Sequence, residues 1–227
     1  MKKITELIVA LNVAVFLYMG ISGMSEGYIT ANFAFSGENI ANGKYWVPFT
    51  ALLIHGNIVH LILNSIALFF FGNALEPKVG NVKYLLIYLA GGIGGFLLSM
   101  LFYSPSIPIV GASGSIFAIM GAAMLLHPFE LISYPYLIPL PIALVGVLYS
   151  IKNVMDLASG REGNIAYIAH VGGLAIGVLL GLREEGSKKG LLIVIAILVL
   201  ISLAPFIITK LLPPDYTSLI GKAIAGQ

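Results

Sequence analysis

The chain has 227 residues, of which 59% are hydrophobic and only 10% are charged, and its formal net charge is +2. A soluble domain typically has roughly 45–50% apolar and about 25% charged residues, so this apolar excess is too large for one soluble core. The composition excludes a soluble enzyme, a disordered chain and a nucleic-acid-binding protein, because the last would need a clustered basic surface. The absence of cysteine excludes disulfides, thiolate metal sites and a cysteine nucleophile. These exclusions leave a polytopic membrane protein built as a single domain, residues 1–227.

A transmembrane helix needs about 20 mostly apolar residues. Seven segments are candidates: residues 4–22, 59–75, 83–103, 113–126, 138–155, 165–182 and 191–210. Between the first two, residues 23–48 are polar and Gly-rich with several aromatic side chains, which predicts a structured loop outside the membrane. The expected fold class is therefore all-α, a polytopic membrane helix bundle.

Orientation is predicted from Lys and Arg in the loops, because cytoplasmic loops carry an excess of both. A cytoplasmic N-terminus places seven basic residues on that side: Lys2, Lys3, Lys78, Lys83, Arg183, Lys188 and Lys189. Five fall on the other side: Lys44, Lys152, Arg161, Lys210 and Lys222. We therefore expect the N-terminus inside and the C-terminus outside. The first helix is expected to stay uncleaved, because no A-x-A-type site follows it.

Four polar side chains interrupt the apolar spans, where each costs several kcal/mol unless it is paired or hydrated. His60 and Asn64 lie one turn apart on one face of the second span, Ser113 begins the fourth, and His170 lies near the start of the sixth. All three spans begin on the outer side in the predicted topology. The four side chains are therefore expected in one layer of the bundle.

The fourth span is short, and this places Ser113 below the outer surface. Its 14 residues make a helix of about 21 Å, against a hydrocarbon thickness of about 30 Å. A helix that begins inside the membrane exposes unpaired N–H groups, which are tolerated only where it lines a cavity. We expect a recessed, water-filled cavity, open to the outside, with Ser113 at its floor.

Small residues predict that the fourth and sixth spans pack closely. The sixth span carries glycines on the face of His170, namely Gly173, Gly177 and Gly181. The fourth span offers matching small residues, namely Gly114, Ala118, Gly121 and Ala122. Close packing would bring Ser113 and His170 within hydrogen-bond reach, as a nucleophile and its base. The cluster Gly91–Gly95 is interpreted as helix packing as well.

Each polar residue also has a structural interpretation. A membrane histidine often serves packing, a serine at a helix start is often an N-cap, and His60 with Asn64 could join helices. His55 and His127 are interpreted as interfacial, and Glu76 as a structural hydrogen-bonding or ion-pair residue. Metalloprotease and aspartyl chemistry are excluded, because the chain lacks HExxH and lacks a pair of aspartates in its spans.

Three motifs in this order resemble those of rhomboid intramembrane serine proteases. His60–Asn64 resembles the HxxxN motif, Gly111–Gly114 resembles GxSG, and Ala169–Gly177 resembles the AHxxGxxxG helix. The resemblance covers residues 46–183, and Glu76 also fits the family pattern. It implies a six-helix core, about residues 4–183, followed by a seventh transmembrane helix at about 190–211.

The resemblance also implies roles for individual residues. Ser113 would be the nucleophile and His170 the general base of a Ser–His dyad without a third acid. His60, Asn64 and the backbone N–H of Ser113 would bind the oxyanion, together with the backbone at Ala112. The substrate would be a transmembrane segment of another protein in the bilayer, with no cofactor, metal or nucleic acid involved. The expected location is the plasma membrane of a prokaryote.

Two departures from the family pattern concern the first loop and the histidine. The Trp-Arg pair of the loop is Trp46-Val47 here, so the loop lacks the arginine that would hold it. The aromatic residue four positions after Ser113 is Phe117, which can stack on His170 but has no hydroxyl group. By analogy with the family, the fifth span, which is poor in glycine and without an obvious polar anchor, is expected to move when substrate enters.

Two other functions compete with proteolysis as interpretations of the sequence. A small channel or transporter would need polar residues along both halves of the spans, and the inner half is nearly devoid of them, with Ser65 the main exception. A non-catalytic protein that binds transmembrane helices would lack the serine or the histidine. Ser113 and His170 are both present, so the sequence favours a protease.

Overall fold

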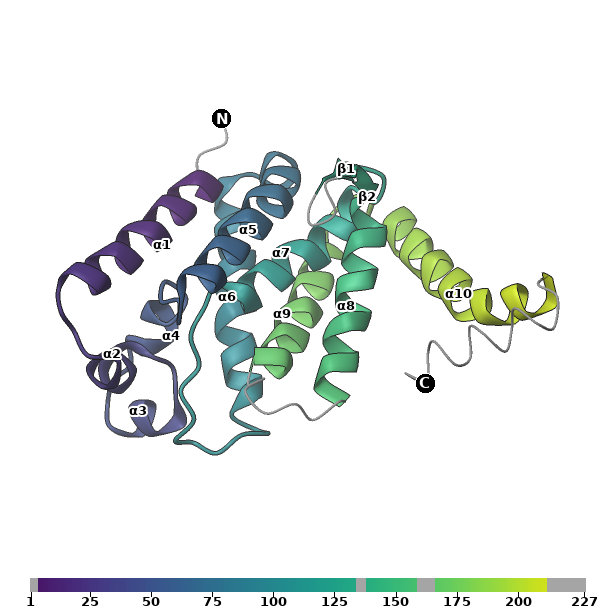
Figure 1. Cartoon of the computed structure of the whole chain (residues 1–227). Coiled ribbons are helices and arrows are strands. Elements are labelled where there is room, and N and C mark those ends of the chain that lie inside the picture. Colours follow the sequence, from purple (N-terminus) through teal and green to yellow (C-terminus); the bar gives the residue numbers. More distant parts are fainter. Residues whose placement is uncertain (1–3, 134–137, 159–165, 212–227) are drawn as a thin grey trace.

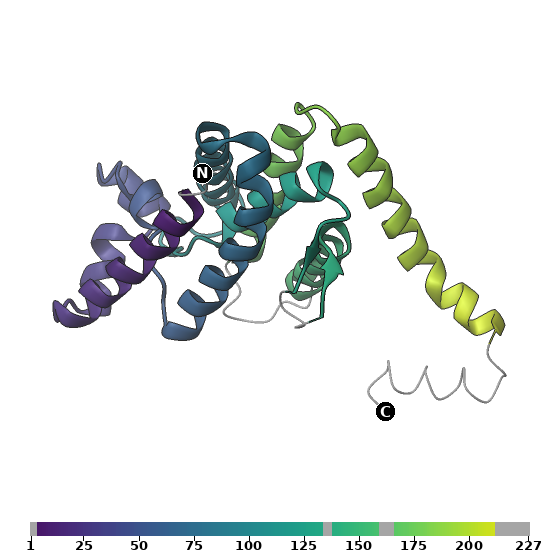
Figure 2. The same ribbon diagram turned by 90° about the horizontal axis from the view of Figure 1, so that it is seen from above.

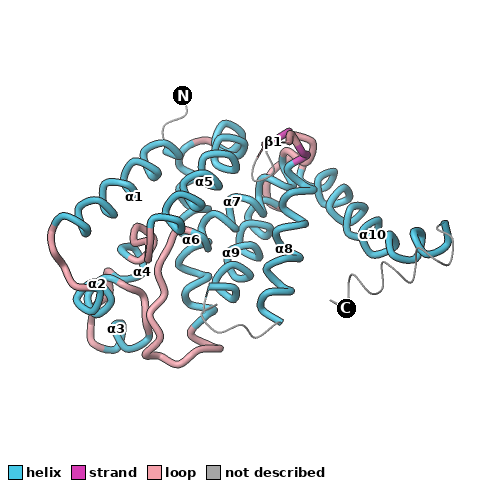
Figure 3. The backbone as a smooth tube through the Cα atoms, viewed as in Figure 1, coloured by secondary structure: helices cyan, strands magenta, loops and turns pink. Residues whose placement is uncertain are grey.

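The computed structural model describes residues 4–133, 138–158 and 166–211. Lys2, Lys3, Arg161 and Lys222, on which part of the predicted orientation depends, lie outside these ranges. The described chain forms helices α1 (Ile4–Ile21), α2 (Glu26–Phe33), α3 (Gly37–Ala41), α4 (Val47–Thr50), α5 (Ile58–Val79), α6 (Asn81–Ser99), α7 (Ser113–Leu126), α8 (Ile142–Ala158), α9 (Ala166–Gly181) and α10 (Ser187–Leu211). Two short strands, β1 (Leu131–Ile132) and β2 (Leu140–Pro141), pair antiparallel before α8 (Figure 3).

Each of the seven predicted spans overlaps one of the long helices, so the all-α bundle is confirmed. Helices α1, α5 and α6 are long and apolar enough to cross a membrane, while α7 and most of α9 form shorter apolar helices. The number of spans and the division into a six-helix core with one added helix remain predictions. The chain is accordingly treated as an integral membrane protein.

Helix α7 lies at the centre of the bundle, with α5, α6, α8 and α9 packed around it (Figure 1). Every residue of α7 is buried except Ser113 and Phe117. Helices α1 and α10 lie on opposite sides, and α10 leans away from the bundle along its length (Figure 2). The two partly exposed residues of the central helix therefore mark the face on which a cavity can open.

Glycines let α9 approach the backbone of α7. A Cβ atom on Gly173 would lie 2.0 Å from the Gly114 carbonyl oxygen, and one on Gly177 would lie 1.9 Å from that of Ala118. Gly181 packs on Ala122 in the same way, at 3.0 Å from its Cα. The predicted matching of small residues on these two helices is confirmed.

A buried carboxylate fixes α1 to α5. Glu76 accepts hydrogen bonds from the backbone N–H groups of Ile4 and Thr5, both at 3.0 Å, and from the Thr5 hydroxyl at 2.7 Å. The negative charge lies at the positive end of the α1 dipole and satisfies N–H groups that have no partner within the helix. The structural interpretation of Glu76 is confirmed.

The loop predicted at residues 23–48 contains helices α2 and α3 and the start of α4. It is held without the arginine of the family pattern. The Trp46 indole N–H donates to the Asn32 carbonyl at 2.8 Å, and the Lys44 ammonium donates to the Ala31 carbonyl. Asn39 donates to the carbonyl of Ala34 at 2.9 Å. Side-chain donors from several positions thus hold this loop together.

Candidate active site

Ser113 is the first residue of α7, and the turn before it exposes its backbone. Gly111 has a φ of +118°, a conformation that favours glycine, and its N–H donates to the Ala51 carbonyl at 2.8 Å. Ala112 is the N-cap and supplies no side-chain hydrogen bond. The N–H groups of the first turn therefore have no intrahelical acceptor, and the positive end of the helix dipole lies at Ser113.

His170 meets Ser113 across the α7–α9 contact. Its Nε2 lies 2.8 Å from Ser113 Oγ, so the predicted approach of these two side chains is confirmed. The Phe117 ring stacks on the imidazole, with ring centroids 4.4 Å apart and planes 7° apart, and Tyr167 contacts it edge-on at 6.1 Å. Two aromatic rings therefore fix the plane of the imidazole.

A third polar side chain contacts His170, and sequence reasoning did not find it. Asn153 Oδ1 lies 2.7 Å from His170 Nδ1, and Asn153 Nδ2 donates to the Tyr167 carbonyl at 3.1 Å. Asn153 lies on α8 and is 5% exposed. The expectation that the fifth span has no polar anchor is wrong, because Asn153 joins α8 to α9. Asn153 lies near the end of the fifth predicted span, and His170 lies near the start of the sixth. The two residues are therefore expected on the same side of the bundle, and this was the signal that the sequence offered.

His60 and Asn64 lie on α5, and both line a cavity of about 260 Å³ with Ser113 and His170. Asn64 Nδ2 is buried and has no hydrogen-bond partner among the described residues. The His60 ring packs against Gly111, where a Cβ atom would lie 2.8 Å from both Cε1 and Nε2. An amide and an imidazole therefore line the same small space as Ser113 and its base.

His55 lies in the loop before α5 and contacts His60 edge to face, with ring centroids 5.0 Å apart. Burial, together with the neighbouring His60, lowers the pKa of His55 to about 4, so its ring is neutral at physiological pH. His55 is 6% exposed, and the interfacial position expected for it stays a prediction. His55 therefore packs behind His60 as a neutral ring.

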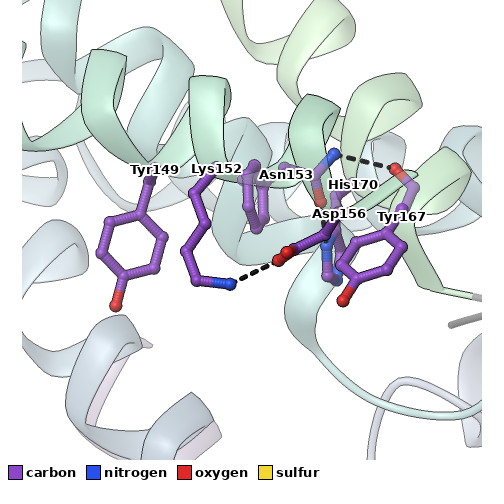
Figure 4. A pocket seen from close by; sticks show the side chains of 7 residues that line it. Tyr149, Lys152, Asn153, Asp156, Tyr167 and His170 are labelled. Carbon is purple, nitrogen blue, oxygen red and sulfur yellow. Dashed lines mark hydrogen bonds and ion pairs between the residues drawn. The ribbon is translucent and has the colours of Figure 1, made fainter. Parts of the chain in front are cut away.

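A second cavity, of about 420 Å³, also borders His170 (Figure 4). It is lined by Phe117, Tyr149, Lys152, Asn153, Asp156, Tyr167 and His170. An ion pair of Lys152 with Asp156, one turn apart on α8, is present along its wall. His170, Phe117 and Tyr149 line both cavities, so the imidazole lies between the two spaces.

Apolar helices that enclose a hydrogen-bonded serine and histidine define a helical membrane protein with a potential nucleophile and base. The family model of the rhomboid domain matches residues 42–185. This chain belongs to the rhomboid family.

Three relatives show how far the similarity extends. The chain is 28% identical to RHOMBOID-like protein 12, mitochondrial, of Arabidopsis thaliana, over 80% of this chain and 58% of that protein. It is 34% identical to rhomboid protease GluP of Bacillus subtilis (strain 168), over 81% of this chain and 36% of GluP. It is 31% identical to the putative rhomboid protease YdcA of the same organism, over 66% of this chain and 72% of YdcA. The chain thus spans less than two thirds of the length of the first two.

Proposed function

We propose that this protein is an intramembrane serine protease, which hydrolyses a peptide bond in or near a transmembrane segment of another membrane protein. The observation that carries the proposal is the 2.8 Å contact of Ser113 Oγ with His170 Nε2 inside an apolar bundle. A nucleophile bonded to a base is the arrangement that covalent acyl transfer requires. The name of the relative GluP, a rhomboid protease, supports the same activity.

The chemistry follows from the Ser113–His170 pair. His170 Nε2 takes the hydroxyl proton as Ser113 Oγ attacks the scissile carbonyl, and it then gives that proton to the departing amine. The product of this step is an acyl-enzyme ester on Ser113. A water molecule, deprotonated by His170, hydrolyses the ester and restores the serine. No metal or cofactor takes part in this sequence.

The oxyanion of each tetrahedral intermediate is expected to bind four donors. These are the backbone N–H groups of Ser113 and Ala112 and the side chains of His60 and Asn64. The free, buried Asn64 amide supports this role, because an unpartnered buried donor is costly unless it serves a ligand. Donors placed before the reaction are worth more in a dry site than in water, and losing one typically costs about 10²–10³ in rate.

The proposed substrate is a transmembrane segment that enters the bundle laterally and unwinds in the cavity. A peptide bond within a helix is inaccessible to Ser113, so the segment must lose its helical hydrogen bonds before attack. The cavity beside His60 and Asn64 accommodates only a few residues at about 260 Å³. An unwound stretch next to the cleavage site fits this space, and an intact helix does not.

The proposed location is the plasma membrane of a prokaryote, with the N-terminus in the cytoplasm and the cavity open to the extracytoplasmic side. The excess of Lys and Arg on the inner side of the predicted topology supports this orientation. The start of α7 inside the bundle supports a cavity below the outer surface.

Labelling with a fluorophosphonate probe tests the proposal without knowledge of the substrate. The probe phosphonylates serines that an adjacent base activates, and mass spectrometry locates the adduct. We expect one adduct on Ser113 in detergent-solubilised protein and none in His170→Ala or Ser113→Ala. Thermal unfolding followed by circular dichroism verifies that both variants fold.

An adduct on Ser113 that persists in folded His170→Ala would contradict the role of His170 as base. Folded wild-type protein that stays unlabelled would exclude an activated serine and favour a channel or a helix-binding protein.

A further inference from the structure

The Asn153 side chain makes two contacts that together fix its orientation. Nδ2 lies 3.1 Å from the Tyr167 carbonyl oxygen, and Oδ1 lies 2.7 Å from His170 Nδ1 (Figure 4). A backbone carbonyl only accepts hydrogen bonds, so the group facing Tyr167 is the donating NH2. The group facing His170 is therefore the amide oxygen, which only accepts.

This orientation assigns the proton of the neutral His170 ring. An amide oxygen 2.7 Å from Nδ1 requires that Nδ1 carries the hydrogen and donates it. In a neutral imidazole the other nitrogen is then the acceptor. Nε2 therefore presents its lone pair to the Ser113 hydroxyl, which is the form that a general base needs.

We infer that Asn153 is a positioning residue, which holds His170 in the Nδ1–H form so that its Nε2 can accept the proton of Ser113. This inference rests on the proposed function for its catalytic consequence. Asn153 touches neither the serine nor the scissile bond and acts through the imidazole alone. It occupies the place that a carboxylate takes in a Ser-His-Asp triad, but it accepts the Nδ1 hydrogen bond without a negative charge.

The position of Asn153 on α8 suits this role. Its carbonyl partner, Tyr167, lies one turn before His170 on α9, so one amide bonds to both the backbone and the side chain of the same helical turn. Asn153 is 5% exposed, which limits competition by water for either hydrogen bond. Phe117 stacks on the ring and fixes its plane, while Asn153 fixes which nitrogen faces Ser113.

The tautomer is measured directly by ¹⁵N NMR of the histidine side chains, independently of any activity. The chain has four histidines, and His170→Ala identifies the signals of His170. We expect the unprotonated type of signal at Nε2 and the protonated type at Nδ1 in wild-type protein. The leucine side chain in Asn153→Leu has a similar size and no hydrogen-bond acceptor. In this variant we expect part of the protein to carry the imidazole proton on Nε2 instead of Nδ1.

The rate of phosphonylation measures the consequence for Ser113. A general base increases the rate of a reaction about 10²–10⁴-fold, and a misoriented base retains part of this increase. Asn153→Leu should therefore lower the maximal rate of adduct formation about 10- to 100-fold. The probe concentration at half-maximal rate should stay within about twofold, because Asn153 does not line the space beside Ser113 and Asn64. Asn153→Asp keeps an acceptor oxygen and should recover part of the lost rate.

Ser150→Ala is the matched control on the same helix, because among the described residues Ser150 bonds to the Gly146 carbonyl of its own helix and to no other group. It should react at the wild-type rate. An unchanged tautomer in folded Asn153→Leu overturns the inference, and so does a rate equal to that of Ser150→Ala. Wild-type protein that shows the expected tautomer but takes no probe would refute the proposed protease and leave the positioning of His170 intact.

Discussion

Gly111 sets the positions of both Ser113 and His60. An alanine at Gly111 would be strained at a φ of +118°, at a cost of about 1–3 kcal/mol, and its Cβ would meet the His60 ring at 2.8 Å. We expect Gly111→Ala to lower the phosphonylation rate of Ser113 about 100-fold, comparable to the loss of one oxyanion donor. The measurement is the rate of adduct formation in detergent.

Gly43→Ala separates backbone strain from displacement of His60. Gly43 also has a positive φ, +80°, but no atom lies within 4 Å of an added Cβ. It should lower the melting temperature and leave the rate of adduct formation unchanged. Equal rates in the two variants would show that the contact of Gly111 with His60 is unimportant.

The residues of the candidate site differ in how well the sequence predicts them. Ser113, His170, His60 and Asn64 lie in short motifs whose spans begin on one side of the membrane, so topology alone gathers them. Asn153 could not be assigned in this way, because its direction depends on the rotation of α8 about its axis. That rotation is set by packing, such as Gly146 against the Met124 sulfur. The same helix also carries Ser150, Lys152 and Asp156, so the sequence does not reveal which of its polar side chains faces His170.

At the scale of helices, the α7–α9 contact holds the serine next to its base. A Cβ atom on Gly177 would lie 1.9 Å from the Ala118 carbonyl oxygen, so Gly177→Ala must separate the two helices. Overpacking of this kind costs about 1–3 kcal/mol. We expect a lower melting temperature and loss of most Ser113 labelling, since the Ser113–His170 distance increases with the helix separation.

The same substitution at Gly20 of α1 provides the comparison. No atom lies within 4 Å of a Cβ added there, so Gly20→Ala should preserve both stability and labelling. If Gly177→Ala behaves like Gly20→Ala, the close packing of α7 and α9 is not needed for the reactive pair.

The lengths of the apolar segments in the sequence predicted the long helices, but the residues at which these helices begin and end depend on tertiary contacts. Helix α5 continues to Val79, past the predicted end at residue 75, because α1 satisfies the buried carboxylate of Glu76. Helix α8 begins at Ile142 rather than at residue 138, because Leu140 and Pro141 pair with β1. The short helices α2 and α3 escaped prediction because side-chain bonds to distant carbonyls, such as those of Asn39, stabilise them.

At the scale of the whole molecule, α1 is a peripheral helix fixed by one carboxylate. Glu76→Ala would leave the buried N–H of Thr5 and the partly buried N–H of Ile4 without this acceptor, and an unsatisfied buried group costs about 1–3 kcal/mol. We expect a clear fall in melting temperature. Labelling of Ser113 should persist, because 12 residues of α5, about 18 Å, separate Glu76 from Asn64.

Glu38→Ala, at an exposed glutamate in α3, controls for the loss of a negative charge and should melt like wild type. A folded Glu76→Ala protein without labelling would reveal a catalytic contribution that the structure does not assign to Glu76. An unchanged melting temperature would show that the hydrogen bonds of Glu76 to Ile4 and Thr5 are not what fixes α1.

The hydrogen bond between Asn153 and His170 joins two helices as well as two side chains. Any outward displacement of α8 that opens the bundle carries Asn153 away from α9, and His170 then loses the acceptor for its Nδ1 hydrogen. Opening of the bundle and reactivity of Ser113 thus oppose each other through one contact. A protein that admits its substrate past α8 would react more slowly while open and would regain its full rate only when α8 returns, which favours cleavage of segments that stay long enough for closure.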